Sequence, residues 1–564
     1  MTNWEIALNL MDVKTLLSLQ GNRRLASMYE KSAFSVAALE RNISSVEDIL
    51  FLPERIRTDV DELVRTGKLS FKKELEDLIP KGLRMIGSLP EMRPDNAIKI
   101  YEALGVGSIS DLRRIITNGK MRSTNGFGIR IEEQVRKSLL AYEKGKKTLT
   151  LFEGFSYGNS IKSLLRENGI EKVEVAGSVR RGKEVVSNLN IVIGIKGDVE
   201  FAKSVIKKNI RFKRVSKENG EKLYLTDRRN TELKFLIVKE PYFYSALAYY
   251  TGSKVHNDKI KHIAKVKGFK VSREGYIDFP FRSEEELYKS LSLQYIPPEL
   301  REGGGEVEAA SKNLLPELIT YDDIKGDLHT HTDFSDGTNS LYDMVEEAIF
   351  HGYEYLAITD HSESAKVANG LNSHRLLKQM KIIDKMNKSG EITLLKGSEL
   401  EIGKNGDIDY GDSLLNSLDI RIGGMHTGFE DDKMESTRRI TNALSSGFID
   451  ILAHPTGRLI PVREGFKLDM EKVFDCAVKY NVALEVDVFP NRMDLSSNLI
   501  KQARNFGVRY FSVDTDSHNA GHLNFMRYGV KILRRAGLKK ENVVNTFEKS
   551  EIKEWLSARK HLRH

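Results

Sequence analysis

Hydrophobic residues recur at helical spacing in the first part of the chain and form short apolar runs further along. Within residues 1–85, the segment VKTLLSLQGNRRLASMYEKSAFSVAALERNI has apolar positions three and four apart, which predicts short helices. Residues 86–148 continue the helical pattern, with a turn at Thr124–Gly128. From Lys172 on, the runs KVEVAGSV, LNIVIGI, KLYLTD and ELKFLIV predict a small sheet in an α+β domain spanning residues 149–294.

A break in the pattern separates this region from the rest of the chain. The sequence YIPPELREGGGEVEAA contains a Pro-Pro pair and a glycine triplet, which interrupt helix and strand alike, so residues 295–320 are predicted to be a linker. Residues 321–564 then alternate apolar strands with helices, as in YLAITD, ITLLKGSEL, IRIGGMH, FIDILAH, VALEVDV and VRYFSVDTD. This alternation predicts parallel strands in a barrel-like α/β domain.

Charge divides the 564 residues at about the same place. Residues 1–320 carry 55 Lys and Arg against 43 Asp and Glu, whereas the remainder carries 33 against 37. A basic half suits a polyanion and an acidic half suits metal ions, although solvated lysine-rich helices would give the same count. One cysteine, Cys476, excludes an internal disulfide. With no basic leader and no long apolar run, we expect a cytoplasmic protein that does not contact membranes.

Histidines and carboxylates stand at the ends of the predicted C-terminal strands. The carboxyl ends of parallel barrel strands converge on one face, so these side chains should meet in one cleft. Two imidazoles in a His-x-His strand also point to the same side. The predicted metal ligands are His329, His331, Asp336, His361, Glu399, His426, His454, Asp516 and His518.

Nine such groups are too many for one ion and enough for two or three. Imidazole together with carboxylate suits zinc, manganese or iron rather than calcium. Closely spaced ions stabilise both oxygens of a phosphoryl transfer, so no serine or cysteine nucleophile is needed. The alternative is that these histidines are hydrogen-bonded core residues, as we expect for His351, His374 and His522.

The motifs DLHTHTDFSDGT, AITDHS, AHPTGR and TDSH resemble the PHP (polymerase and histidinol phosphatase) domain over residues 320–564. The resemblance implies a distorted seven-stranded barrel with a trinuclear metal site, and all nine ligand positions carry permitted residue types. Asp516, Glu399 and His454 are the expected catalytic ligands, with the two carboxylates bridging ions. Arg458, and more weakly Arg492, are candidates to hold a substrate phosphate, or else structural arginines.

The first half resembles a family X DNA polymerase. VAGSVRRGKE and YYTGSKVHN are similar to its palm and nucleotide-binding segments, and YIPPELRE is similar to its joint with a PHP domain. The resemblance implies an 8-kDa-like helical domain over 1–85, a fingers-like region over 86–148, and palm and thumb over 149–294. Its predicted nucleotide-binding residues are Gly177, Ser178, Arg180, Arg181, Lys183, Gly252, Ser253 and Lys254.

The chain departs from that family where the palm should hold magnesium. Nucleotidyl transfer needs carboxylates to hold two ions, and the family pattern has an Asp-x-Asp pair and a third Asp. This sequence has Asn188, Asn190 and Glu232 there. Because neutral amides cannot supply the missing charge, we expect no magnesium at the palm and polymerase activity that is absent or very weak.

Helix-hairpin-helix loops, which hold a DNA phosphate with glycine amides, are also altered. LPERIRTD and LPEMRPDN lack the glycines, whereas TNGFGIRIEE keeps Gly126 and Gly128. Arg55 and Arg93 either compensate electrostatically or are solvated helix residues.

The preferred hypothesis is a metal-dependent DNA phosphodiesterase, a 3′–5′ exonuclease or end-processing enzyme of DNA repair that binds gapped duplexes or 3′ ends. Three alternatives stay open: a small-molecule phosphatase of the histidinol-phosphatase type, a DNA-binding scaffold with both centres idle, and an active polymerase with an unusual metal site.

Overall fold

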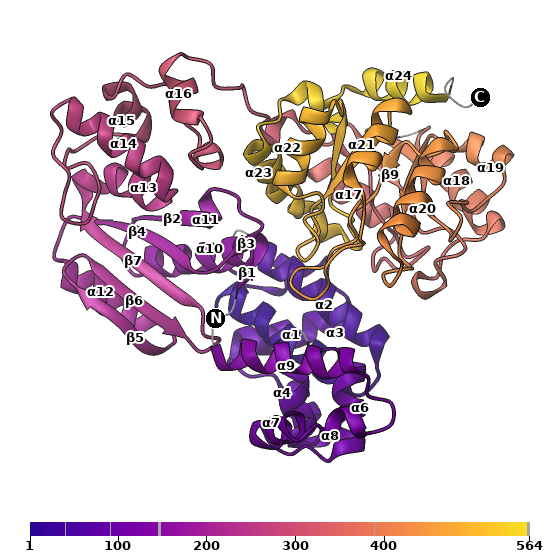
Figure 1. Ribbon diagram of the computed structural model, residues 1–564, viewed down its shortest axis with the longest axis horizontal. Coiled ribbons are helices and arrows are strands. Elements are labelled where there is room, and N and C mark those ends of the chain that lie inside the picture. Colours follow the sequence, from indigo (N-terminus) through magenta and orange to yellow (C-terminus); the bar gives the residue numbers. More distant parts are fainter. Residues whose placement is uncertain (40, 91, 145–147, 389, 561–564) are drawn as a thin grey trace. The chain divides into compact units, whose positions relative to one another are not determined.

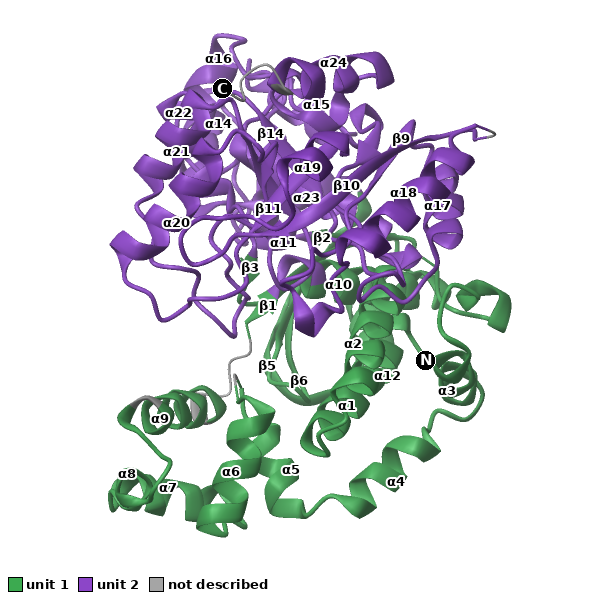
Figure 2. Cartoon of the chain, turned by 90° about the vertical axis from the view of Figure 1, so that its right-hand side faces the viewer, with its two compact units in different colours: residues 1–149, 153–175, 185–240 green, residues 150–152, 176–184, 241–564 purple. Residues whose placement is uncertain are grey.

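A computed structural model describes the whole chain except residues 40, 91, 145–147, 389 and 561–564 (Figure 1). The chain divides into two compact units, coloured separately in Figure 2. Unit 1 contains residues 1–149, 153–175 and 185–240, and unit 2 contains residues 150–152, 176–184 and 241–564. The residues expected to form a thumb therefore group with the C-terminal region and not with the palm sheet.

Short helices make up the first part of unit 1, as the apolar spacing predicts. The first helix, α1, has a capping box in which Thr2 and Glu5 bond each other's backbone amides. The predicted turn at Thr124–Gly128 is confirmed, because it joins α8 to α9. The helices are α1 (Asn3–Leu19), α2 (Arg23–Ala38), α3 (Glu54–Thr66), α4 (Ser70–Leu78), α5 (Lys81–Gly87), α6 (Pro94–Leu104), α7 (Ile109–Thr117), α8 (Lys120–Ser123) and α9 (Ile129–Lys144).

A five-stranded sheet follows, in the order β2-β4-β7-β6-β5. The predicted strands are confirmed as β2 (Lys172–Ala176), β4 (Leu189–Ile195), β6 (Lys222–Asp227) and β7 (Glu232–Lys239). The sequence did not predict β5 (Phe212–Asn219), which is almost wholly exposed and has no apolar alternation. Helices α10 (Leu151–Glu167) and α12 (Val199–Asn209) accompany this sheet, and β1 (Leu149–Thr150) pairs with β3 (Val185–Val186).

The thumb-like part of unit 2 has its own apolar core, which includes Ile260, Leu287 and Tyr288. Its helices are α13 (Phe243–Thr251), α14 (Lys254–Val266) and α15 (Glu284–Ser290). The predicted linker contains a further helix, α16 (Glu306–Ser311), and is packed against this core. Within it, Arg301 is completely buried and bonds Glu284 at 2.7 Å, so this segment is part of the folded unit.

The C-terminal region is the predicted seven-stranded parallel barrel, in the order β8-β9-β10-β11-β12-β13-β14. Parallel pairing runs through the whole series, and a bridge between Thr330 and Ser517 brings its two edges together. The strands are β8 (Gly326–Asp327), β9 (Tyr355–Ile358), β10 (Thr393–Glu401), β11 (Ile420–Gly424), β12 (Ile451–Leu452), β13 (Ala483–Asp487) and β14 (Phe511–Asp514).

Helices between the strands cover the outside of the barrel, and its inner apolar core is closed by the last helix, through Ile552, Trp555 and Leu556. These helices are α17 (Leu341–Phe350), α18 (Ser373–Met386), α19 (Asp412–Ser417), α20 (Lys433–Ser445), α21 (Met470–Lys479), α22 (Ser497–Phe506), α23 (Met526–Ala536) and α24 (Lys549–Lys560). Among the described residues, no helix is both long and apolar enough to cross a membrane.

The ion pair between Glu284 and Arg301 gives a test of the thumb-like core. Burial opposes ionisation of Glu284, but Arg301 and Arg180 outweigh it and lower its pKa to about 2 from 4.5. Glu284→Gln leaves a buried guanidinium without a counter-charge, and we expect unit 2 to lose about 3 kcal/mol or more of unfolding free energy in urea at pH 7.

Since the folded pKa is depressed, this stabilisation is complete above about pH 4.5 and disappears as the pH falls toward 2. Glu285→Gln, on the exposed side of the same helix, is the matched control. Equal unfolding curves for the two variants would contradict the assignment.

Candidate metal centre

All nine predicted ligands lie around the carboxyl ends of the barrel strands. The structure brings them into three overlapping groups, each with ligand atoms within 4.8 Å of one another. The groups are His331, Asp336, His361 and His518; His329, His331 and Asp516; and His361, Glu399 and His426. His454 joins through Glu399, whose Oε1 is 2.8 Å from its Nε2.

Glu399 occupies the middle of the cluster. Its Oε2 lies 2.9 Å from Nδ1 of His361 and 3.4 Å from Nε2 of His329. Its other oxygen faces Nε2 of His426 at 3.2 Å, on the side of His454. Because the two oxygens face different histidines, this carboxylate is arranged to contact two ions.

Asp516 and Asp336 complete the cluster on the opposite side. Asp516 Oδ1 is 3.1 Å from Nε2 of His331 and 3.6 Å from Nδ1 of His518. The carboxylate of Asp336 is 3.3 Å from Nε2 of His518 and 3.8 Å from Nε2 of His361. Each carboxylate therefore lies between two imidazoles, which is the donor arrangement that a divalent ion requires.

The cluster keeps its central carboxylates charged although they are buried. Burial opposes ionisation of Glu399, but His361, His426 and His329 outweigh it and hold its pKa well below the usual value. The pKa of Asp516 is lowered in the same way, by His329 and His518 against burial. Conversely, burial and the neighbouring His361 and His518 lower the pKa of His331 to about 3, so its ring is neutral. An ionised carboxylate and a neutral imidazole are the forms that bind metal, and the ring of His331 is already neutral. The neighbouring carboxylates outweigh burial and raise the pKa of His361 and of His426, so these rings must lose a proton to bind an ion.

Several buried ring nitrogens have no hydrogen-bond partner. They are His329 Nε2, both nitrogens of His331, His361 Nδ1, His426 Nε2 and His454 Nδ1. Leaving a buried polar atom unsatisfied costs about 1–3 kcal/mol, so such a concentration needs an explanation. Metal ions supply it, because a neutral imidazole offers its lone pair to zinc, manganese or iron. The residues therefore fit a centre of two or three divalent ions, as the sequence predicts.

Two of the ligands have backbones in the left-handed region. His454 has φ 27° and Asp516 has φ 49°, values that are uncommon for residues other than glycine. Such conformations cost about 1–3 kcal/mol each and persist where the surroundings impose them, most often at functional sites. The fold thus holds these two side chains toward the cluster against local preference.

Sequence reasoning missed the carboxylates behind the histidines. Nδ1 of His329 donates to Glu485 at 2.7 Å, and Nδ1 of His426 donates to Glu401 at 2.6 Å. Each carboxylate accepts a hydrogen bond from Nδ1 of the histidine. The other ring nitrogen, Nε2, is therefore directed toward the cluster. Burial raises the pKa of Glu485 to about 7 against the effect of His329. In the predicted strand VALEVDV, Glu485 and Asp487 are two residues apart and therefore point to the same face. No ligand was assigned to this strand, so the two acids could have been found from the alternation.

The two arginine candidates differ in their surroundings. Arg458 donates to the carbonyl oxygens of Arg492 and Met493, so it holds the loop that follows β13. Arg492 is half-buried, with its Nε 3.3 Å from Asp516 Oδ2 and 3.2 Å from Asp487 Oδ2. The weaker sequence candidate is therefore the one in contact with a ligand of the cluster.

The other predicted binding residues of unit 2 are largely engaged with acids. Helix α11 (Gly177–Arg180) is a single turn, and Arg180 bonds Glu284 and Thr251. Arg181 bonds Glu302 at 2.7 Å and lies against Gly252, while Lys183 is 3.8 Å from Glu302. Ser253 caps α14, whose first residue, Lys254, is exposed. Most of the positive side chains that were predicted to bind a nucleotide are thus paired with acidic side chains of the protein.

The substituted carboxylate positions lie on the sheet of unit 1. Asn190 donates to the side-chain oxygen of Asn188 at 2.9 Å, so the two amides bond each other. Glu232 is paired with Lys234 across 3.1 Å. Among the described residues, every group of three or more potential metal ligands lies in the barrel.

In the helical region, Gly126 has φ 89° and no atom near its Cβ position, and the space at Gly128 is equally open. Arg55 lies over Phe71, 4.3 Å from the ring centre, and 3.8 Å from Asp59, which ties it to its own helical subdomain. Arg93 is exposed at the start of α6. The open glycine turn thus matches the predicted phosphate contact better than the first arginine does.

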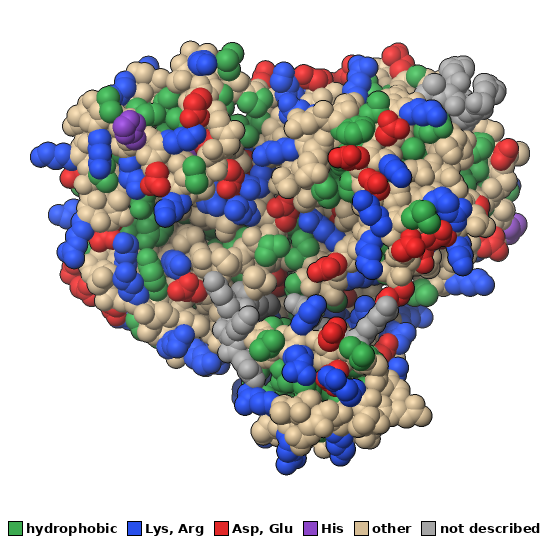
Figure 3. All heavy atoms as spheres, in the orientation of Figure 1, with side chains coloured by type: hydrophobic (Ala, Val, Ile, Leu, Met, Phe, Trp, Pro, Cys, Tyr) green, Lys and Arg blue, Asp and Glu red, His purple; other side chains and the backbone are tan. Residues whose placement is uncertain are grey.

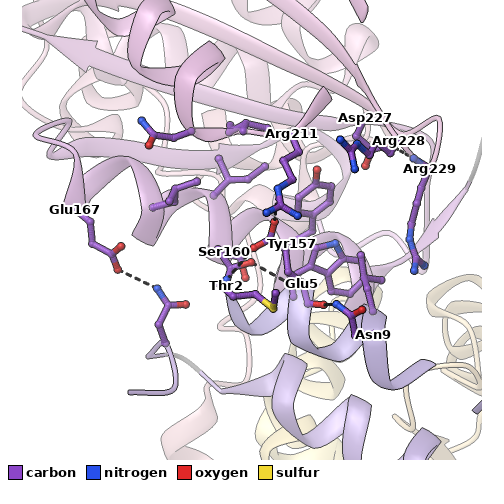
Figure 4. A pocket seen from close by; sticks show the side chains of 18 of the residues that line it. Thr2, Glu5, Asn9, Tyr157, Ser160, Glu167, Arg211, Asp227, Arg228 and Arg229 are labelled. Carbon is purple, nitrogen blue, oxygen red and sulfur yellow. Dashed lines mark hydrogen bonds and ion pairs between the residues drawn. The ribbon is translucent and has the colours of Figure 1, made fainter. Parts of the chain in front are cut away.

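Unit 1 also has a cavity of about 390 Å³, lined by Trp4 and Tyr157 among others (Figure 4). Charges at its rim are paired, with Arg229 3.2 Å from Asp12 and Arg211 3.9 Å from Glu5. The candidate ligand histidines of the barrel, in contrast, are buried except for His426, which is partly exposed, and hardly any histidine is visible on the face in Figure 3.

Glu485 provides a test of how the cluster is oriented. Glu485→Gln weakens the bond that directs Nε2 of His329, and we expect about a 10- to 100-fold loss of metal affinity, measured by competition with a chelator. Glu471→Gln, on the exposed face of α21, should bind metal as the wild type does. Unchanged affinity in the Glu485 variant would show that the ring is oriented by other contacts.

Comparisons with known proteins agree with this geometry. The DNA polymerase beta thumb family matches residues 246–302, and the PHP domain family matches residues 327–489. A Thermoanaerobacter protein described as a "probable phosphatase" is 29% identical over 42% of this chain and 95% of its own length. One from Citrobacter koseri is 31% identical over 39% of this chain and 89% of its own.

A relative in Bacillus subtilis strain 168, described as "DNA polymerase/3'-5' exonuclease PolX", matches far more of the chain. It is 34% identical over 542 residues, which is 94% of this chain and 95% of that protein. Identity at this level, across thumb and barrel alike, shows that the chain belongs to the PolX family of family X polymerases with a C-terminal PHP domain.

Proposed function

We propose that the chain is a metal-dependent DNA phosphodiesterase that removes nucleotides from 3′ ends, and that its palm contributes little or no polymerisation. The observation that carries the proposal is the convergence of nine ligands, with their unsatisfied ring nitrogens, on one end of the barrel. The Bacillus relative, whose name includes a 3′–5′ exonuclease, supports DNA as the substrate. Gapped duplexes and 3′ ends in DNA repair are the proposed targets.

The residues of the barrel define the roles. His329, His331, His361, His426, His454 and His518 would hold two or three divalent ions together with Asp336, Glu399 and Asp516. Such ions, when bound, supply Lewis acidity toward the phosphate and lower the pKa of bound water. Glu399 presents both oxygens to the centre, and the buried walls exclude bulk solvent.

Arg492 contributes a fixed positive charge beside Asp516, close to where a phosphate would approach the ligands. Its planar guanidinium suits phosphate oxygens, whereas Arg458 acts indirectly by bonding the backbone carbonyls of residues 492 and 493. We therefore assign phosphate contact to Arg492 and loop positioning to Arg458.

Loss of polymerase activity is supported by the palm sheet. Two carboxylates are replaced by amides that bond each other, and the remaining Glu232 is paired with the ammonium group of Lys234. Magnesium binding would need Glu232 to leave that pair and would still lack two charges. Among the described residues of unit 1, no group of three or more potential metal ligands replaces the missing carboxylates, which supports the proposal.

The PHP-only relatives described as probable phosphatases favour a second candidate, hydrolysis of a small phosphomonoester. The retained thumb region and basic first half argue against it, since a free phosphomonoester needs no such platform. Comparing the rates on histidinol phosphate and on a primer–template distinguishes the two functions.

The first test uses a 5′-labelled gapped duplex with manganese and no nucleotides. We expect a ladder of products shortened from the 3′ end, and a loss of at least about a thousandfold in rate for His329→Ala or Asp516→Ala, because each removes a ligand of the centre. His374→Ala, outside the cluster, is the control. A ladder that persists in both ligand variants would reject the barrel as the nuclease.

The second test adds the four deoxynucleotides and magnesium to the same duplex. We expect no extension by Asp516→Ala protein, in which shortening cannot mask synthesis, and no change with Glu232→Gln. Extension that depends on Glu232 would show that one carboxylate suffices and that the palm is an active polymerase.

A further inference from the structure

Two aromatic rings and an arginine form a planar stack near the metal centre. The rings of Phe429 and Phe466 are nearly parallel, at an interplanar angle of 8°, with centroids 4.1 Å apart. The guanidinium carbon of Arg463 lies 3.6 Å from the centre of the Phe429 ring. Two groups this close to one ring centre must lie on opposite faces of it, so the order is Arg463, Phe429, Phe466.

The stack is formed by the two loops that follow the predicted metal ligands His426 and His454. Phe429 follows His426 by three residues, and Gly457, whose Cβ position lies 2.3 Å from the Phe466 ring, follows His454 by three. Three residues span at most about 11 Å, and strands β11 and β12 are paired neighbours. The stack therefore lies beside the part of the centre where His426, with 27% of its side chain exposed, faces solvent.

Both loops are held rigidly. Arg439, itself buried, donates to Thr427 at 3.0 Å and to Asp431 at 2.9 Å, on either side of Phe429. In the other loop, the amide of Phe466 donates to Thr456 at 2.7 Å, and Arg463 donates to Gly457 at 2.9 Å. A platform fixed before the substrate arrives binds without the entropic cost of ordering it.

The surroundings determine what this platform can accept. Phe466 is 7% exposed and closes the inner end, whereas Arg463 at the outer end is partly exposed, so a further planar group would be added beyond Arg463. Glu430 directly follows Phe429 and Glu464 directly follows Arg463 in the chain, and both are exposed, so their negative charges disfavour a second phosphate there. An uncharged ring system on the substrate is the group that fits, and arginine and aromatic planes are the usual partners of unpaired nucleobases.

We propose that Arg463 and Phe429, supported by Phe466, form a base-stacking subsite that receives the 3′-terminal nucleobase while its phosphodiester lies at the metal centre. The inference rests on the proposed nuclease function and adds a substrate preference to it. The enzyme should discriminate between 3′-terminal nucleotides by whether they carry a base, and should be slow on a baseless terminus.

The test compares kcat/KM on two 5′-labelled primer–templates, one ending in thymidine and one in a tetrahydrofuran abasic nucleotide. Wild-type protein should prefer the thymidine end, and Phe429→Leu should lower that ratio by about five- to a hundredfold. Arg463→Lys, which keeps the charge and loses the plane, should act in the same direction. Phe350→Leu, at a site 83% exposed on α17, and Arg438→Lys are the matched controls.

A second readout needs no catalysis. With EDTA present, the fluorescence of a 3′-terminal 2-aminopurine should be quenched on binding wild-type protein and quenched less on binding Phe429→Leu or Arg463→Lys.

Equal loss of rate on both substrates, with unchanged quenching, would mean that the stack only supports its loops and would overturn the inference. If wild-type protein with manganese cleaves neither substrate, the proposed nuclease function fails, and the inference with it. Cleavage of both at one rate contradicts the inference alone.

Discussion

One buried carboxylate, Glu399, organises the C-terminal domain. Removing a charge from water is expensive unless counter-charges or ligands surround it, and five histidines face this carboxylate within 3.6 Å. All five come from segments that follow four other strands, so the barrel must close in register before the charge is satisfied. The candidate metal cluster and the fold thus depend on the same electrostatic requirement.

A second layer of acids makes this arrangement specific. Glu401 and Glu485 each accept a hydrogen bond from Nδ1 of a predicted ligand histidine. This bond determines that Nε2 is the nitrogen that faces the cluster. Asp360, buried next to His361, bonds the backbone and hydroxyl of Thr332 and thereby holds the loop that follows His331. Glu485 also accepts a hydrogen bond from the backbone amide of His454, which helps to hold the left-handed backbone of that residue.

The polymerase-like half shows a different use of charge. Arginines that could have met a triphosphate are paired with Glu284 and Glu302, and the remaining palm carboxylate is paired with Lys234. Cations and anions that would otherwise serve magnesium and nucleotide neutralise each other. These pairings support the proposal that the chain keeps the scaffold of a polymerase and carries out its chemistry in the barrel.

The sequence alone predicted parallel strands in a barrel-like domain and the nine candidate ligands, because parallel strands bring their carboxyl ends together whatever the connecting helices are. The seven-stranded form came from the resemblance to the PHP domain, and the strand order came from the structure. The resemblance to family X polymerases also located the substituted carboxylate positions in the palm, because such substitutions can be read directly from the residue types. Tertiary structure was needed for the roles of Arg458 and Arg492, which are indistinguishable in sequence and are separated only by what lies beside each guanidinium. Likewise, Glu485, the packed segment around Arg301 and the stack on Phe429 depend on contacts between residues far apart in the chain, and local patterns carry no information about such partners.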